Sequence, residues 1–179
     1  VCVLSTGGLH LDGLADTADA WIGGQGDRDR TLAIMKDPRS GPIAIVVIAL
    51  VLLNKFAAME ALLVGDARIL LLLAPVLGRA LVVLLLITTP YVRPEGLGAP
   101  YARFLPRLSC GLMVLLISTV TVAALDWRGG ALLGVLGLGF FGLRQALLHR
   151  LGGITGDTLG AACELAETAV LLVPLLLPD

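Results

Sequence analysis

Three aspartates near the start of the chain have a spacing that suits metal-dependent chemistry. Asp12, Asp16 and Asp19 stand four and three residues apart, so a helix with 3.6 residues per turn places their carboxylates on one face. Like charges at this spacing repel one another unless a cation lies between them. Because Mg²⁺ prefers oxygen ligands and leaves room for water and phosphate, the stripe predicts a magnesium site. The alternative is a solvated acidic helix start.

A glycine-rich segment near the other end of the chain is typical of a phosphate contact. It follows Arg150 and leads into an apolar stretch that we expect to be helical. Backbone N–H groups at a helix start bind anions, and glycines allow a phosphate to approach closely. The predicted ligand-binding residues are Gly152, Gly153, Thr155, Gly156 and Thr158. Asp157 and Glu164 follow on one helical stripe and are further metal candidates.

Two basic positions elsewhere are candidates for binding an anion. Arg39 lies in a turn-prone basic segment at residues 36–41, which is either a phosphate contact or an ordinary charged loop. Arg79 falls in the middle of an apolar stretch, where a charge is expected to face a protein interior or a cavity. We predict that Arg79 binds an anion. The alternative is a structural ion pair with Glu60 or Glu164.

Composition assigns the chain to a membrane. Hydrophobic residues make up 57% and charged residues 15% of its 179 residues, which is outside the usual range for soluble domains. The net charge of −1 and the scarcity of aromatic residues argue against nucleic acid as a partner. We therefore predict an all-α, polytopic membrane bundle. It is expected to form one catalytic domain over residues 1–179.

Five complete membrane spans are expected. They cover residues 43–64, 69–89, 108–125, 131–148 and 159–177. The apolar residues 1–4 are interpreted as the tail of a further helix whose beginning is missing. Lys55 and Glu60, in the second half of the first span, are expected to snorkel to the membrane surface. The run Gly134, Gly137, Gly139 and Gly142 predicts close helix packing.

The distribution of basic residues predicts the orientation. The loop before the first complete span carries Arg28, Arg30, Lys36 and Arg39, and the loop after the second carries Arg93, Arg103 and Arg107. The intervening connections carry only Arg68 and Arg128. By the positive-inside rule, all the motif-bearing segments face the cytoplasm and form one composite site in the cytoplasmic (inner) membrane.

Carboxylates, arginines and a glycine-rich turn at one membrane face suit phosphate chemistry. An ion-coupled transporter is the competing class, because charges within spans often mark transport pathways. Most of the acidic residues, however, stand where loops join helices rather than in the middle of spans. The residues therefore favour an enzyme.

The motifs resemble those of a known family. Residues 7–19 look like the signature of the cobalamin synthases, the adenosylcobinamide-GDP ribazoletransferases. Residues 34–41, 78–80, 91–98 and 151–164 are similar to later motifs of that family, in the same order. The resemblance extends over nearly the whole chain. Family members carry a further apolar section before it, and acidic residues there are expected to add to the site.

The resemblance implies a reaction. A hydroxyl of α-ribazole, or of its 5′-phosphate, would attack the phosphorus linked to cobinamide in adenosylcobinamide-GDP, and GMP would leave. It implies Mg²⁺ as cofactor, the membrane lipid as surroundings and no nucleic acid; an oligomer is compatible with it. The metal would lie at Asp12, Asp16 and Asp19. The diphosphate would be neutralised by Arg39, Arg79, Arg93 and Arg150.

Two alternatives remain open beside this reading. His10 is a candidate acceptor for the hydroxyl proton, or it is a hydrogen-bonding residue at the entry to a helix. The carboxylates also resemble those of the CDP-alcohol phosphotransferases, although the full pattern of that family is absent. Release of GMP from a cobinamide substrate, as opposed to release of CMP with a lipid alcohol, distinguishes the two families.

Overall fold

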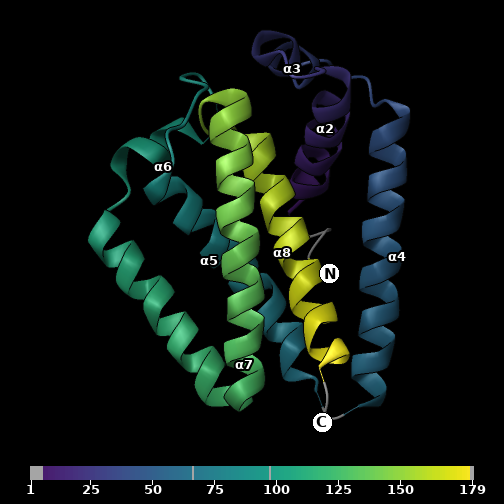
Figure 1. Ribbon diagram of the computed structural model, residues 1–179, viewed down its shortest axis with the longest axis vertical. Coiled ribbons are helices and arrows are strands. Elements are labelled where there is room, and N and C mark those ends of the chain that lie inside the picture. The colour runs from purple at the N-terminus through teal and green to yellow at the C-terminus, as the bar shows by residue number, and fades with distance from the viewer. Residues whose placement is uncertain (1–5, 66, 97, 178–179) are drawn as a thin grey trace.

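The computed structural model describes residues 6–65, 67–96 and 98–177, which form a helical bundle (Figure 1). Within these ranges the only β-type pairing is one parallel bridge between Tyr91 and Ile154. The helices in chain order are α2 (Leu9–Gly23), α3 (Arg28–Ile34), α4 (Pro42–Val64), α5 (Ile69–Thr88), α6 (Ala99–Phe104), α7 (Arg107–Leu151) and α8 (Gly156–Leu176). The predicted all-α class is confirmed. The apolar residues 1–4 lie outside the described ranges.

Four helices are long and apolar enough to cross a membrane, namely α4, α5, α7 and α8. Large apolar side chains on their outer surfaces are exposed, including Leu53 and Phe56 of α4 and Leu72 of α5. A soluble protein would bury such residues, whereas lipid tails solvate them. The described part of the chain is therefore built as a membrane protein.

Helix α7 contains two of the predicted spans. Its 45 residues would extend roughly 68 Å if straight, about twice the thickness of a bilayer core. The chain instead turns at Asp126, whose φ of 50° and ψ of −134° are not helical, and the two halves form the V-shaped hairpin of Figure 1. A Cβ at Gly129 would lie 2.6 Å from the carbonyl oxygen of Thr121. Glycine therefore permits the halves to approach at the turn.

Helix α8 lies at the centre of the bundle, in contact with α2, α4, α5 and α7 (Figure 1). It is also the most buried of the four long helices. Glycines allow its neighbours to come close: a Cβ at Gly13 of α2 would lie 2.7 Å from the carbonyl oxygen of Asp157, and one at Gly78 of α5 would lie 2.9 Å from Cγ of Glu167. The acidic residues of α8 are thereby brought against α2 and α5.

The glycine run of α7 does not behave as predicted. Added Cβ atoms at Gly134, Gly137, Gly139 and Gly142 would meet no atom within 4 Å. The prediction of close packing there is wrong. Close packing occurs at isolated glycines on the helices that surround α8.

Candidate active site

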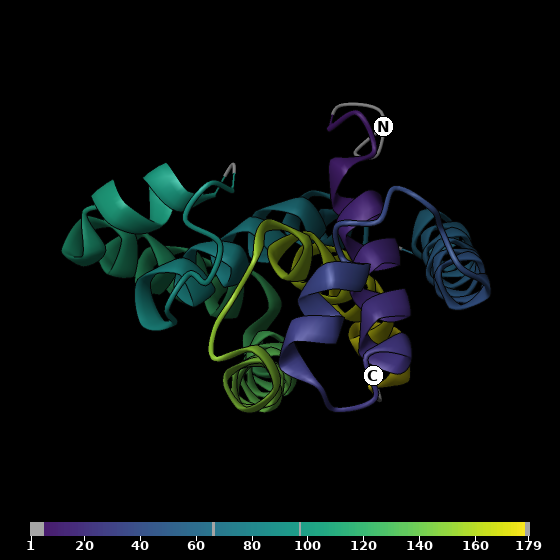
Figure 2. The same cartoon turned by 90° about the horizontal axis from the view of Figure 1, so that it is seen from above.

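Most of the sequence motifs lie at the end of the bundle where α8 begins (Figure 2). Residues 78–80 are the exception and lie further along α8, beside Glu167. The loop after α5 pairs with the loop before α8: Val92 N–H donates to the Ile154 carbonyl at 2.9 Å, and Ile154 N–H donates to the Pro90 carbonyl at 2.8 Å. Helix α3 covers the same end. The loop after α5, the start of α8 and α3 therefore lie side by side at this end, and the composite site stays a prediction.

Asp12 and Asp16 face the first turn of α8 across the Gly13 contact. Asp12 is exposed and Asp16 is half-buried. Within the described ranges, neither carboxylate accepts a hydrogen bond or forms an ion pair. Burial, together with the negative charges of Asp12 and Asp157, raises the pKa of Asp16 to about 6, although Arg93 acts in the opposite direction. Three carboxylates therefore share one region of negative potential.

Asp157 links this region to the loop after α5. Its Oδ2 accepts a hydrogen bond from Nη1 of Arg93 at 2.5 Å, and both side chains are about one-fifth exposed. Arg93 also reaches the Leu32 carbonyl on α3, at 3.5 Å. Arg93 lines a cavity of about 480 Å³ between α3 and residues 92–96. A cationic side chain thus connects the carboxylates to this cavity.

Asp19 has a different role from its neighbours on the stripe. One of its carboxylate oxygens accepts the N–H of Gly41 at 2.5 Å, and the other accepts the N–H of Ala44 at 3.0 Å. These are the unsatisfied donors at the start of α4, where Pro42 occupies the first turn. Asp19 therefore caps α4. A metal role for this residue, predicted from the spacing, finds no support in its placement.

The donor set fits magnesium better than a metal that is held by protein alone. In the described ranges, no group of three or more His, Cys, Asp or Glu side chains is arranged to hold a metal ion. Mg²⁺ is commonly held through one or two carboxylates, with waters and substrate phosphates completing its shell. Asp12 and Asp16, unpaired and one turn apart, suit that mode. Asp157, paired with Arg93, is the third candidate.

The glycine-rich loop serves mainly to shape the chain. Gly152 ends α7 with a φ of 77°, and a Cβ at Gly153 would collide with the Pro90 carbonyl. Thr155 and Thr158 are fully buried and form the capping box of α8, each side chain bonding the other's backbone N–H at 3.2 and 2.8 Å. Of the predicted phosphate-binding residues, only Gly152 and Gly156 are exposed.

Two of the predicted anion-binding arginines have protein partners at this end. Arg150 donates to the Trp21 carbonyl at 2.8 Å and to Thr31 at 3.2 Å, and its guanidinium lies over the Trp21 ring. It thereby joins the end of α7 to α2 and α3. Arg39 is largely exposed and pairs with Asp37 at 2.7 Å. This pairing lowers the pKa of Asp37 to about 2.

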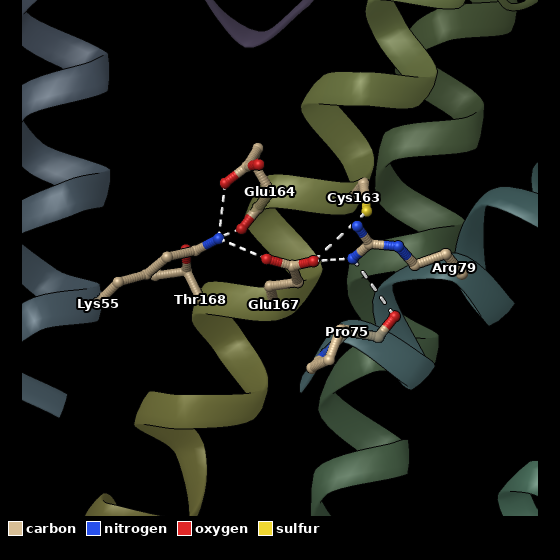
Figure 3. Close-up of polar contacts among 7 residues, drawn as sticks. All are labelled: Lys55, Pro75, Arg79, Cys163, Glu164, Glu167 and Thr168. Atoms are coloured by element: carbon tan, nitrogen blue, oxygen red, sulfur yellow. Dashed lines mark hydrogen bonds and ion pairs between the residues drawn. The ribbon is translucent and has the colours of Figure 1, made fainter. Parts of the chain in front are cut away.

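The remaining predicted arginine, Arg79, belongs to a charge cluster, which comprises Lys55, Arg79, Glu164 and Glu167 (Figure 3). Lys55, Glu164 and Glu167 are buried, whereas the side chain of Arg79 is 38% exposed. Nζ of Lys55 lies 2.6 Å from Glu164 and 2.7 Å from Glu167. Arg79 pairs with the other oxygen of Glu167. Two cations and two carboxylates from α4, α5 and α8 thus balance in charge.

This arrangement corrects several expectations. Lys55 does not snorkel, because its side chain is only 10% exposed. Arg79 takes the ion-pair alternative, although its partner is Glu167 rather than Glu60 or Glu164. Glu164, predicted as a metal candidate, is bound by Lys55, two turns further along α8 than Asp157. Glu167 was not among the predicted residues. Its position within an apolar span was a signal for a partner of Lys55 or Arg79, because charges within spans normally pair with one another.

His10 lies between the two groups of acids. Its backbone packs against Gly160 of α8, where a Cβ would lie 3.1 Å from the His10 carbonyl oxygen. Gly160 is one turn after Asp157 and one turn before Glu164. Burial and the nearby charge of Arg79 lower the pKa of the half-buried His10. The charges that act on its side chain are those of Arg79, Glu164, Glu167 and Lys55, so His10 lies on the side of that group of charges.

Comparison with known proteins supports one family. A family model described as cobalamin-5-phosphate synthase matches residues 1–175. A protein of Pseudomonas syringae pv. syringae (strain B728a), named adenosylcobinamide-GDP ribazoletransferase, is 58% identical over 98% of this chain and 72% of its own length. Proteins of the same name from Pseudomonas fluorescens (strain SBW25) and Ectopseudomonas mendocina (strain ymp) are 54% and 58% identical, over 95% and 93% of this chain and 70% and 68% of their own lengths.

No solved structure matches the chain. The family match nevertheless covers almost every residue, and the named relatives are more than half identical to it. The chain is therefore a transferase of the membrane and a member of the cobalamin-5-phosphate synthase family.

Proposed function

We propose that this protein joins adenosylcobinamide-GDP to α-ribazole, or to α-ribazole 5′-phosphate, and releases GMP in a Mg²⁺-dependent reaction. The names of the relatives support the substrates. The observation that carries the chemistry is the meeting of Asp12, Asp16 and Asp157 with Arg93 beside a polar cavity. Phosphoryl transfer depends mainly on positioning and charge neutralisation, and this arrangement provides groups for both.

The chain's own residues take the following roles in this reaction. The acceptor hydroxyl forms a bond to the phosphorus that carries cobinamide, and the bond from that phosphorus to the GMP oxygen breaks. His10 takes the proton from the hydroxyl. Arg93 donates hydrogen bonds to phosphate oxygens as negative charge develops on them.

Asp12 and Asp16 are the residues that would hold Mg²⁺, with Asp157 as a further ligand when Arg93 turns to substrate. The bound ion would neutralise charge on the phosphate oxygens of the diphosphate. Asp19 is left out of this set because it caps α4.

We place the site at the cytoplasmic face of the inner membrane, with lipid around the apolar helices. The support is the excess of Lys and Arg in the loops at the α3 end compared with the opposite end. Single cysteines at Arg30 and Gly130 test this placement, because both positions are exposed and lie at opposite ends. An impermeant thiol reagent added outside intact cells should label Gly130→Cys alone. Labelling of both positions, or of Arg30→Cys alone, would contradict the placement. An oligomeric state stays a prediction.

The activity is tested by incubating purified protein in lipid nanodiscs with adenosylcobinamide-GDP, α-ribazole and Mg²⁺. We expect stoichiometric GMP and a cobalamin product, both abolished by EDTA and restored by Mg²⁺. The opposing arm supplies a CDP-alcohol and a lipid alcohol. Release of CMP there, without GMP release from the cobinamide substrate, would overturn the proposal in favour of the CDP-alcohol phosphotransferase reaction.

A further inference from the structure

The cavity between α3 and the loop after α5 combines features that a simple phosphate pocket would not have. Its polar walls are Lys36, Arg93 and Glu95, and its apolar walls are Leu32, Val92 and Pro94. Two cations suit an anion, whereas a carboxylate beside them would repel it. The set fits a ligand that carries a phosphate and also N–H donors on a flat apolar body.

We propose that this cavity binds the leaving nucleotide, and that Glu95 selects guanine by accepting hydrogen bonds from its ring N–H and its amino group. This inference rests on the proposed function, because it assigns a place to the nucleotide of the substrate. Guanine presents two adjacent donors on one edge, which a carboxylate with two acceptor oxygens matches. Adenine presents no such pair. The volume of about 480 Å³ is within the range of small-molecule sites, and a corrin ring is much larger than a nucleotide.

The turn that carries Glu95 is held in place before any ligand arrives. Gly96 N–H donates to the Arg93 carbonyl at 3.0 Å. The Tyr91 ring packs against Gly96 and Gly98, where added Cβ atoms would lie 2.5 and 2.8 Å from ring or hydroxyl atoms. Tyr91 itself pairs with Ile154 beside α8. Glu95 is therefore presented from a fixed turn, which lowers the entropy cost of binding.

Arg93 connects the cavity to the reacting centre. Its Nη1 is committed to Asp157, its Nη2 makes only a long contact with Leu32, and its buried Nε has no hydrogen-bond partner in the described ranges. A guanidinium has five N–H donors, so this one retains donors for a phosphate. A nucleotide in the cavity would place its phosphate between Arg93 and Lys36. The group to be displaced would then adjoin Asp157.

The test measures equilibrium binding of GMP and AMP to the protein in nanodiscs, without cobinamide substrate. The wild-type protein should bind GMP at least tenfold more tightly than AMP, as expected for paired hydrogen bonds to a charged acceptor. Glu95→Gln keeps the size but replaces one acceptor oxygen with an amino group. It should reduce this preference to about twofold or less by weakening GMP binding alone.

Two matched variants, Lys36→Ala and Arg30→Ala, distinguish the phosphate contact from the contact with the base. Lys36→Ala should weaken GMP and AMP equally and reduce the salt dependence of both. Arg30, an exposed cation on α3, does not line the cavity. Arg30→Ala should change neither affinity. Equal affinity of the wild-type protein for GMP and AMP, or an undiminished preference for GMP in Glu95→Gln, would overturn the proposal.

The two proposals fail differently. Glu95-dependent preference for GMP supports the guanine site even when no GMP is released from the cobinamide substrate, and in that case only the proposed reaction is contradicted. GMP release without a Glu95-dependent preference would leave the reaction standing and refute the guanine site.

Discussion

The bundle holds two groups of charged residues that differ in how their charges are balanced. The charge cluster of Lys55, Arg79, Glu164 and Glu167 pairs every carboxylate with a cation in the interior. At the α3 end, Asp12 and Asp16 have no such partner among the residues that the structure describes, and their neighbour Asp157 pairs with Arg93. Balanced charges stabilise a bundle, whereas unbalanced carboxylates at an open end attract a cation. The first group therefore suits a structural role, and we propose that the second takes part in the chemistry.

The largest effect is expected where the unbalanced carboxylates are neutralised. Asp12→Asn and Asp16→Asn should fold normally, because removing one of several like charges relieves repulsion. Turnover should fall roughly 10³-fold, as expected for loss of electrostatic transition-state stabilisation. The measurement is GMP release per folded molecule. Asp29→Asn, an exposed aspartate on α3, is the matched control and should keep full turnover.

Breaking the balanced cluster should act on stability instead. Glu167→Gln leaves Lys55 and Arg79 with only Glu164, and removing one partner of a buried charge group costs about 3–5 kcal/mol. The free energy of unfolding in mixed micelles measures this loss. The double variant Lys55→Met/Glu164→Gln removes one cation and one carboxylate together and keeps the Arg79–Glu167 pair. Its free energy of unfolding should therefore be close to that of the wild type. The contradicting result is a Glu167→Gln protein with normal stability and with turnover as low as that of Asp16→Asn. The two groups would then not differ in role.

Asp19 sharpens the comparison because it lies on the same stripe as Asp12 and Asp16. Asp19→Ala removes both acceptors at the start of α4 and should cost about 1–2 kcal/mol, as lost helix caps do. Turnover per folded molecule should stay near that of the wild type. Loss of turnover on the scale of Asp16→Asn, without loss of stability, would place Asp19 with the metal candidates after all.

The smallest effect is a pH dependence of stability. The pKa of Asp16 is raised from 3.8 to about 6, so between these values the folded protein holds a proton that the unfolded chain releases. In EDTA, this group therefore makes the protein less stable as the pH rises from about 4 to 7. Melting temperatures at pH 4.5 and 7 should show a larger decline in the wild type than in Asp16→Asn. Identical declines would mean that Asp16 is not under the negative potential described here.

The helical bundle was predictable because apolar runs of membrane length admit few other structures. Residues 108–125 and 131–148 were predicted as two spans, and they form the two halves of α7. What the sequence did not reveal was which faces meet. The glycine run of α7 resembles a packing surface in the sequence. The helices that surround α8 instead approach it closely at Gly13, Gly78 and Gly160.

The surroundings of the candidate site residues were only partly predictable, for a related reason. Spacing alone places Asp12, Asp16 and Asp19 on one stripe, and Asp157 and Glu164 on another, but it does not show what lies opposite. Asp19 meets the start of α4, and Glu164 meets Lys55. Both partners are distant in sequence, so periodicity does not indicate them. Among these five acids, Asp12, Asp16 and Asp157 lie near one another without full compensation by cations of the described residues.

We propose that the unbalanced carboxylates, and not the charge cluster, bind the divalent cation. Titration of Mg²⁺ while the melting temperature is followed tests it directly, since a ligand that binds the folded state raises that temperature. The account predicts a saturable rise for the wild type and for Glu164→Gln, and no rise for Asp12→Asn/Asp16→Asn. An unchanged rise in the double variant, or its loss in Glu164→Gln alone, would contradict the account.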